Sequence, residues 1–182
     1  MIKVCRFSLL FFCVAFACSA QSTPQAIPPV KAKALNDAEV ILPNPGDGRV
    51  LVLVLGFSHK SADEIELWGK RLAADFHDNA HVAYYQIPDL QGVPGLVKPM
   101  ILHGMRKDIP EAEYSHFVPI YDHKQGWQSL VNFSAPDDAY VVVASPDGHP
   151  IWQAHGPYSD ETYNELKKFV SGLLEKTSTS AQ

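Results

Sequence analysis

Runs of apolar residues alternate along this chain with segments in which apolar residues recur every three or four positions. Residues 50–55 are apolar and rich in β-branched side chains, which is typical of a strand covered on both faces of a parallel or mixed sheet. Alternation over residues 81–89 predicts a second strand. Residues 140–144 and 151–154 flank the turn sequence Ser-Pro-Asp-Gly, so they predict a β-hairpin.

Two segments carry the signature of amphipathic helices. The first begins at Ser61, where Ser61 as N-cap and Glu64 three residues later would form a capping box. The last begins after Ser159 as cap, with acidic residues in its first turn, where they suit the helix dipole. The buried stripes predicted for these helices are Ile65, Trp68, Leu72 and Phe76 in the first, and Tyr163, Leu166, Phe169, Val170, Leu173 and Leu174 in the last.

The remaining segments are less regular. Prolines in residues 21–35 favour an extended, solvated linker, and residues 37–42 are expected to form a short edge strand before the turn PNPGDG. Prolines among apolar residues in 91–134 predict one or two interrupted helices. Residues 176–182 are polar and are expected to be a disordered tail.

The element order is strand, helix, strand, helical insertion, hairpin, helix, which apart from the insertion is the order of a thioredoxin-like fold. We therefore predict an α/β three-layer sandwich, with a central mixed sheet and helices on both faces. The expected organisation is a signal peptide over residues 1–20, a Pro-rich linker and edge segment over 21–48, the thioredoxin-like domain over 49–175 and the tail.

The first 20 residues have the pattern of a signal peptide. Lys3 and Arg6 accompany an apolar run that is shorter than the ~20 residues of a membrane span and ends in small residues. Cleavage after Ala20 would remove all three cysteines, which are Cys5, Cys13 and Cys18. The predicted product is exported, either periplasmic or secreted. In the alternative, Cys18 carries a lipid anchor.

Composition excludes some partners. The chain has 182 residues, 46% hydrophobic and 19% charged, which suits one ordinary globular domain. Without Lys3 and Arg6, 13 basic residues remain against 20 acidic ones, a net charge of −7. We expect no nucleic-acid binding, and contact with a membrane only through lipidation of Cys18.

The turn Ser58-His59-Lys60-Ser61 follows the first predicted strand and is the candidate binding site. Catalytic thioredoxin-like proteins carry C-x-x-C here, because a helix N-terminus stabilises a thiolate. Serines at the two cysteine positions cannot exchange electrons, which excludes dithiol chemistry. Three roles remain open for the turn: a simple helix start, an anion site made by free N–H groups and Lys60, or a nucleophilic Ser58. A serine hydrolase is disfavoured because only about 30 mature residues precede the strand, too few for the strands that come before a nucleophile elbow.

Eight histidines raise the question of a metal site. His77 and His81 are four residues apart but are separated by an expected loop, and the best remaining group is His116 and His123 with Asp122. We predict neither a metal site nor a cofactor, and assign no catalytic residue.

Residues 104–114 (GMRKDIPEAEY) and 139–170 resemble the ATP10-like family of ATP synthase assembly factors. The resemblance implies a thioredoxin-like fold without a redox cysteine pair. Ile151 stands where an arginine usually precedes the family's tryptophan. The matching positions are Arg106, Lys107, Ile109, Pro110, Tyr140, Asp147, Trp152 and Gly156.

Structural roles also account for these motif positions. Asp147 would belong to a turn, Trp152 would face the core, and Gly156 would lie where no side chain fits. Arg106 and Lys107 would be solvated charges.

Two classes of function follow from this sequence. The favoured one is an exported, redox-inactive domain that binds a protein partner and acts as an assembly or chaperone-like factor. The alternative is an enzyme of redoxin descent, or a Ser58-centred hydrolase with an altered turn. A domain that retains only its fold is a third outcome. A cis-proline facing the turn, as in thioredoxin-like sites, would be Pro136 or Pro119.

Overall fold

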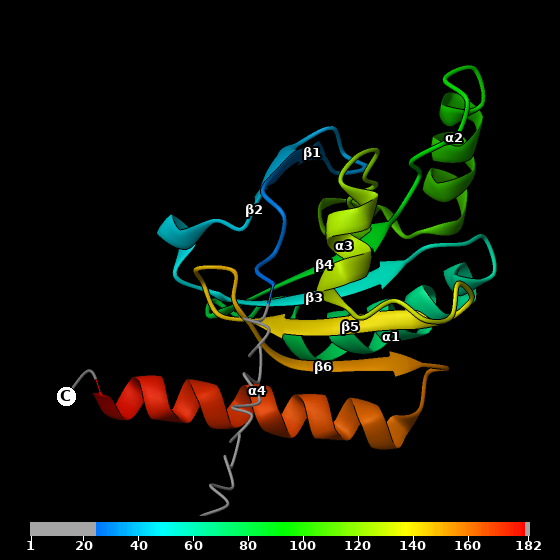
Figure 1. Ribbon diagram of the computed structural model, residues 1–182. Coiled ribbons are helices and arrows are strands. Elements are labelled where there is room, and N and C mark those ends of the chain that lie inside the picture. Colours follow the sequence, from blue (N-terminus) through cyan, green and yellow to red (C-terminus); the bar gives the residue numbers. More distant parts are fainter. Residues whose placement is uncertain (1–24, 181–182) are drawn as a thin grey trace, which may run out of the picture.

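The computed structural model describes residues 25–180 and is built around one four-stranded sheet (Figure 1). The strand order is β4-β3-β5-β6. β3 (Val50–Gly56) pairs in parallel with β4 (Val82–Pro88) and antiparallel with β5 (Ala139–Ala144). β5 pairs antiparallel with β6 (Pro150–Gly156) across the predicted hairpin. The sheet is mixed, as the sequence predicts.

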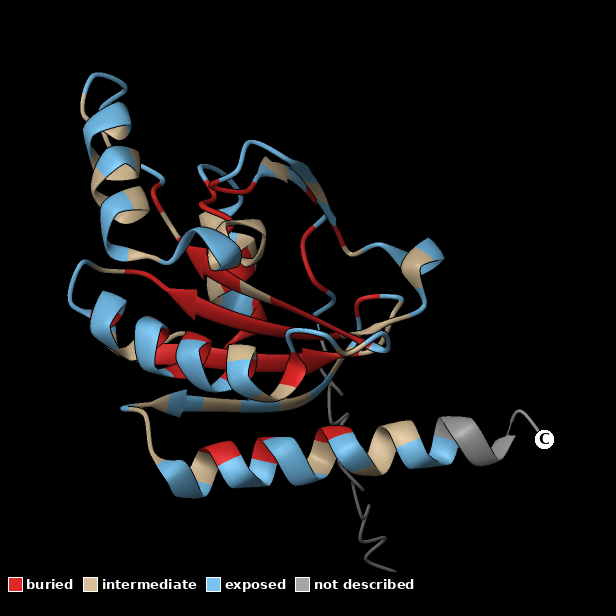
Figure 2. Cartoon of the chain, turned by 180° about the vertical axis from the view of Figure 1, so that it is seen from behind, coloured by how far each residue is buried: buried red, intermediate tan, exposed pale blue. Residues whose placement is uncertain are grey.

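Helices cover both faces of this sheet. On one face lie α1 (Ser61–Phe76) and α4 (Asp160–Ser180), which contribute Trp68, Leu72 and Tyr163 to the core. On the other face lies α3 (Lys124–Leu130), whose Trp127 and Leu130 are buried. Figure 2 shows β3 and β5 almost entirely buried between these layers, which explains their continuous apolar sequences. The predicted three-layer sandwich is confirmed.

The N-terminal segment belongs to the core, and the solvated linker predicted for it is wrong over the described part. β1 (Val30–Lys33) and β2 (Glu39–Leu42) form an antiparallel hairpin, followed by the 3-10 turn η1 (Pro45–Asp47). The prolines permit an extended backbone, but a few apolar side chains decide its position. Ile27, Val30, Leu35 and Leu42 are buried against the domain.

The insertion contains α2 (Lys98–Asp108), the 3-10 helix η2 (Glu111–His116) and α3. No residue of α2 is buried, and the helix stands out from the body of the molecule (Figures 1 and 2). Residues 117–120 then run beside β4, where Val118 N–H donates to the Gln86 carbonyl at 2.8 Å. This segment satisfies backbone groups along the outer edge of β4.

The C-terminal helix begins as predicted, because Ser159 Oγ accepts the N–H of Thr162 at 3.1 Å. It continues to Ser180, so the tail expected from residue 176 is helical up to that point. The predicted signal peptide and Cys18 lie outside the described residues. Among those that are described, no helix is long and apolar enough to cross a membrane.

Candidate functional site

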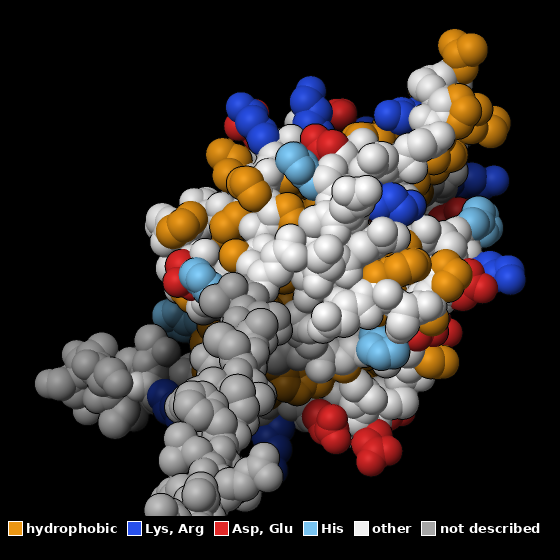
Figure 3. Space-filling view, in the orientation of Figure 1, with side chains coloured by type: hydrophobic (Ala, Val, Ile, Leu, Met, Phe, Trp, Pro, Cys, Tyr) orange, Lys and Arg blue, Asp and Glu red, His pale blue; other side chains and the backbone are white. Residues whose placement is uncertain are grey.

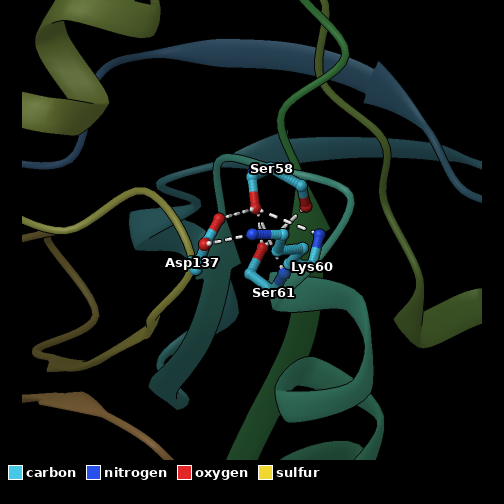
Figure 4. Close-up of polar contacts among 4 residues, drawn as sticks. All are labelled: Ser58, Lys60, Ser61 and Asp137. Carbon is cyan, nitrogen blue, oxygen red and sulfur yellow. Dashed lines mark hydrogen bonds and ion pairs between the residues drawn. The ribbon is translucent and has the colours of Figure 1, made fainter.

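The candidate turn links the carboxyl end of β3 to the start of α1 (Figure 4). Phe57 fixes its approach by packing edge-on against Phe133 and Tyr140, with ring centroids 5.1 and 5.6 Å away. Three exposed or half-exposed residues, Ser58, His59 and Lys60, then lead into the helix. The turn therefore has a rigid apolar base and a polar surface.

The Ser58 hydroxyl, and not that of Ser61 as the sequence predicts, accepts backbone N–H groups where the helix begins. The Ser58 hydroxyl oxygen accepts the N–H groups of Lys60 and Ser61 at 3.1 and 3.2 Å. Ser61 is fully buried, and its hydroxyl donates to the Ser58 carbonyl at 2.8 Å. The predicted capping box is also wrong, because the Glu64 carboxylate accepts the N–H of Tyr158 instead.

Asp137, which the sequence analysis does not single out, completes the site from the loop before β5. Its carboxylate accepts the Ser58 hydroxyl at 2.9 Å and lies 3.3 Å from Lys60 Nζ (Figure 4). The hydrogen bond from Ser58, followed by that from Lys60, lowers the pKa of Asp137. The turn therefore holds a charged carboxylate that comes from 79 residues further along the chain.

Tyr140 positions that loop. Its hydroxyl accepts the N–H groups of Ser134 and Ala135 at 2.9 and 2.8 Å and donates to the Ala135 carbonyl at 2.9 Å. Because the Tyr140 ring also packs on Phe57, one side chain links the strand-to-helix turn to the loop that carries Asp137.

These contacts bear on the other two roles considered for the turn. An external anion would compete with Asp137 for Lys60, and the Ser58 oxygen already accepts the N–H groups of Lys60 and Ser61 at the start of the helix. The partners of that oxygen are two backbone amides and a carboxylate, with no imidazole among them. Within residues 25–180, the only side-chain base on this hydroxyl is the Asp137 carboxylate, and its lowered pKa makes it a weak base, so these surroundings activate the serine poorly as a nucleophile.

The best histidine group in the sequence does not assemble. His116 stacks on Tyr84 with ring centroids 4.0 Å apart, and its Nδ1 lies 3.0 Å from the Tyr84 carbonyl. His123 lies near Asp122 at 3.9 Å. The described part of the chain contains no group of three or more histidine, cysteine, aspartate or glutamate side chains that could hold a metal ion.

An ion pair with a buried carboxylate, which sequence reasoning missed, lies at the same end of the sheet. The Asp89 side chain, only 1% exposed, follows β4 and lies 3.0 Å from Lys124 Nζ. The Asp89 N–H donates to the Gly56 carbonyl at 2.8 Å, which places the pair next to the start of the turn. An acidic residue directly after an apolar strand is the sequence signal that could have identified it.

Comparisons with known proteins show similarity of structure only. The exposed lipoprotein thioredoxin Etrx1 of Streptococcus pneumoniae strain TIGR4 aligns with a TM-score of 0.53 at 11% identity, covering 78% of this chain and 98% of that chain. BsSco, a member of the Sco family of cytochrome c oxidase assembly proteins, gives 0.54 at 14% identity, with 82% and 93% covered. The thioredoxin domain of the thiol-disulfide oxidoreductase BVU-2223 of Bacteroides vulgatus gives 0.51 at 17% identity, with 82% and 98% covered. The fold is thioredoxin-like. No family model and no curated protein sequence matches the chain.

Within this thioredoxin-like fold, the family-motif positions lie apart from the candidate turn. Arg106 is not the solvated charge expected, because its Nε donates to the Leu35 carbonyl at 2.8 Å and its Nη2 lies 3.3 Å from Asp37. It thereby joins α2 to the N-terminal hairpin. Lys107 is exposed, and Pro110 directly precedes η2.

The second motif segment has structural roles. The carboxylate of Asp147 accepts the Ser145 hydroxyl, which lowers the pKa of Asp147, and it pairs with His149 at 3.0 Å within the hairpin turn. Trp152 is half-buried beside Phe169. Gly156 has a φ of +124° with open space around its Cα, so backbone conformation, not the predicted lack of room, favours glycine there.

The proline expected to face a thioredoxin-like site is also different here. Within residues 25–180 the cis peptide bond is Leu42–Pro43, so neither Pro119 nor Pro136 follows one. Pro136 does directly precede Asp137, so its loop meets the turn through the aspartate side chain.

Proposed function

We propose that this chain is an exported, redox-inactive thioredoxin-like domain that binds a protein partner and assists its assembly or folding. One observation carries the proposal. The turn where thioredoxin-like oxidoreductases keep a cysteine pair contains Ser58 and Ser61, and both hydroxyls make hydrogen bonds inside the protein. No cysteine follows Cys18 in the sequence.

The proposed assembly role has two supports. The first is the resemblance of residues 104–114 and 139–170 to ATP10-like assembly factors. The second is the structural likeness to BsSco, whose family is described as cytochrome c oxidase assembly proteins. A scaffold without an electron-carrying group retains only its surface for such a task, and a surface acts by binding.

Export is supported by the leader pattern of residues 1–20 and by the likeness to an exposed lipoprotein. We infer a periplasmic or secreted product, or an anchored one if Cys18 is lipidated. The protein then works outside the compartment that synthesises it.

The enzymatic alternative is an enzyme of redoxin descent or a Ser58-centred hydrolase. It is less well supported because the Ser58 hydroxyl donates a hydrogen bond to a carboxylate of lowered pKa and contacts no imidazole. It predicts turnover that depends on the Ser58 hydroxyl.

The experiment combines capture with turnover assays. A photo-crosslinking amino acid is placed at exposed positions of the full chain, including His59 and Tyr121. The variants are expressed in the cells in which this protein occurs naturally. We expect one discrete crosslinked protein, with Lys168 on the outer side of α4 as the position that gives none. In parallel, the purified chain should neither reduce insulin nor hydrolyse model esters. Turnover that Ser58→Ala abolishes would overturn the proposal. So would the absence of a crosslinked protein at all of the tested positions.

A further inference from the structure

The outer edge of β1 in the N-terminal hairpin carries unpaired backbone groups. Ala34 N–H donates to the Ala38 carbonyl at 2.9 Å, so residues 34 and 38 form a hydrogen-bonded pair. Hydrogen-bonded and non-hydrogen-bonded pairs alternate in an antiparallel ladder, so Lys33 with Glu39 and Lys31 with Ile41 are non-hydrogen-bonded pairs. The N–H and C=O groups of Lys31 and Lys33 therefore point away from β2. In residues 25–180, no backbone hydrogen bond outside the hairpin uses these four groups.

A groove of about 420 Å³ runs along this edge. Five consecutive residues, 31–35, line it. Side chains alternate between the two faces of a strand, so an uninterrupted run of lining residues indicates that the groove follows the edge. Asp37 and Glu39 also line it. Leu102 and Arg106 of α2 form its opposite wall, together with Pro119 and Tyr121.

The charges in this groove leave one cation uncompensated. Lys31 pairs with Glu39 at 2.8 Å, and Arg106 pairs with Asp37. Lys33 has no ion-pair partner within the described part of the chain. Figure 3 shows basic side chains over the hairpin border and hydrophobic ones at the tip of α2. The groove thus combines an apolar wall with a free positive charge.

We propose that an extended segment of the partner protein adds to the open edge of β1 as a third strand. This inference rests on the proposed function, because it names where the partner binds. The segment places an acidic side chain beside Lys33 and an apolar side chain against Leu102 and Tyr121. Backbone hydrogen bonds to Lys31 and Lys33 supply affinity, as in other β-strand additions.

The same lysines argue against a second copy of this chain as the occupant. An antiparallel pairing of two β1 strands about Ala32 would place Lys31 of each copy opposite Lys33 of the other. Like charges directly opposite in a sheet are destabilising. The outer edge of β4 is already occupied by residues 117–120, whereas β1 has only its hairpin partner.

The test uses displayed random decapeptides selected on the full chain, followed by synthesis of the selected peptides. We expect enrichment of acidic and β-branched residues. Lys33→Pro removes an N–H that β2 does not use, so it should weaken peptide binding about tenfold or more. The matched control Lys33→Ala keeps the N–H and loses only the charge, so it should weaken binding about two- to threefold.

A second measurement leaves the protein unchanged. Each peptide position is N-methylated in turn, and binding should be lost at every second position only, because alternate N–H groups of a strand face its neighbour. The edge site would be overturned if Lys33→Pro bound the peptides as tightly as the unmodified chain, or if N-methylation weakened binding without this alternation. It would also be overturned if NMR placed the peptide contacts at the Ser58 turn or at Leu96 and Met100, or if no peptide were selected. If the crosslinked partner persists with Lys33→Pro, the proposed function stands and the edge site fails. If no partner is found at all, the proposed function itself fails.

Discussion

At the scale of single residues, the turn differs from a thiol site at more than its two serines. Asp137 places a negative charge against Ser58. A thiolate at that position would be repelled by this carboxylate, whereas a hydroxyl donates to it. The surroundings of the turn therefore suit a neutral hydrogen-bond donor. Cysteines in place of Ser58 and Ser61 would still have the Asp137 carboxylate as an unfavourable neighbour.

Ser58→Ala tests this arrangement. The hydrogen bond from Ser58 is the largest cause of the lowered pKa, so removing it should raise the pKa of Asp137 toward its ordinary value. An NMR titration of the Asp137 carboxyl chemical shift measures this. Because the folded pKa is lowered, the interaction contributes its stability above the unfolded pKa and loses it as pH falls through the folded pKa.

Lys60→Ala is the matched control for that titration. It removes the ion pair at 3.3 Å and leaves the hydroxyl in place, so it should raise the pKa of Asp137 by less than Ser58→Ala does. A larger change with Lys60→Ala would show that charge, not the serine hydrogen bond, organises the turn.

The sequence predicts the local part of this site and misses the distant part. The position of Ser58 to Ser61 follows from an apolar strand that ends where a helix begins. The assignment of the cap fails because Gly56 leaves room beneath the turn for Ser61: an added Cβ at Gly56 would lie 2.5 Å from Ser61 Oγ. Asp137 could not be assigned, because only the folding of the sheet brings its loop to the turn.

At the scale of elements, apolar spacing predicts what packs, provided the element faces the sheet. All four stripe residues predicted for α1 are buried, whereas α2 buries none of its apolar residues. The N-terminal hairpin is the opposite case, in which a few apolar residues among prolines enter the core. Local composition alone cannot separate these outcomes, because burial depends on where the tertiary structure places each segment.

Two interior helix glycines, Gly69 and Gly104, offer a matched test of this difference. A Cβ at Gly69 would lie 2.3 Å from the buried Gln86 side chain, so Gly69→Ala should lower the free energy of unfolding by about 1 to 3 kcal/mol. A Cβ at Gly104 meets nothing within 4 Å, so Gly104→Ala should raise it by up to about 1 kcal/mol through helix propensity. Urea unfolding measures both. Shifts of the same sign would contradict the contrast between a packed α1 and an exposed α2.

At the scale of the whole molecule, element order was sufficient for the fold. Strand, helix, strand, hairpin and helix appear at nearly the predicted positions, because each has its own hydrophobic period. The element order could not predict which segments cover the edges of the sheet. The placement of residues 117–120 beside β4 and the position of the β1-β2 hairpin depend on contacts between segments far apart in the chain.

The two helices on one face of the sheet are joined by a charged contact that should make stability depend on pH. The Asp75 carboxylate of α1 accepts the Tyr163 hydroxyl at 2.7 Å and Lys167 Nζ at 2.8 Å, both from α4. The hydrogen bond from Lys167 is the main cause of a lowered pKa for Asp75, and Tyr163 adds to it. A lowered folded pKa means that the contact stabilises the protein above the unfolded pKa of Asp75 and ceases to do so as pH falls through the folded pKa.

Asp75→Asn retains an acceptor for Tyr163 and removes the charge. It should lower the free energy of unfolding by about 1 kcal/mol at pH 7, a modest value because the pair is partly solvated. The difference from the unmodified chain should vanish in acid, once the carboxylate is protonated in both folded and unfolded states. Lys167→Met should remove the same pH-dependent contribution to the free energy of unfolding. The double variant should be only slightly less stable than either single variant. A difference that stays constant from neutral to acid pH in urea unfolding would show that shape and not charge joins α1 to α4.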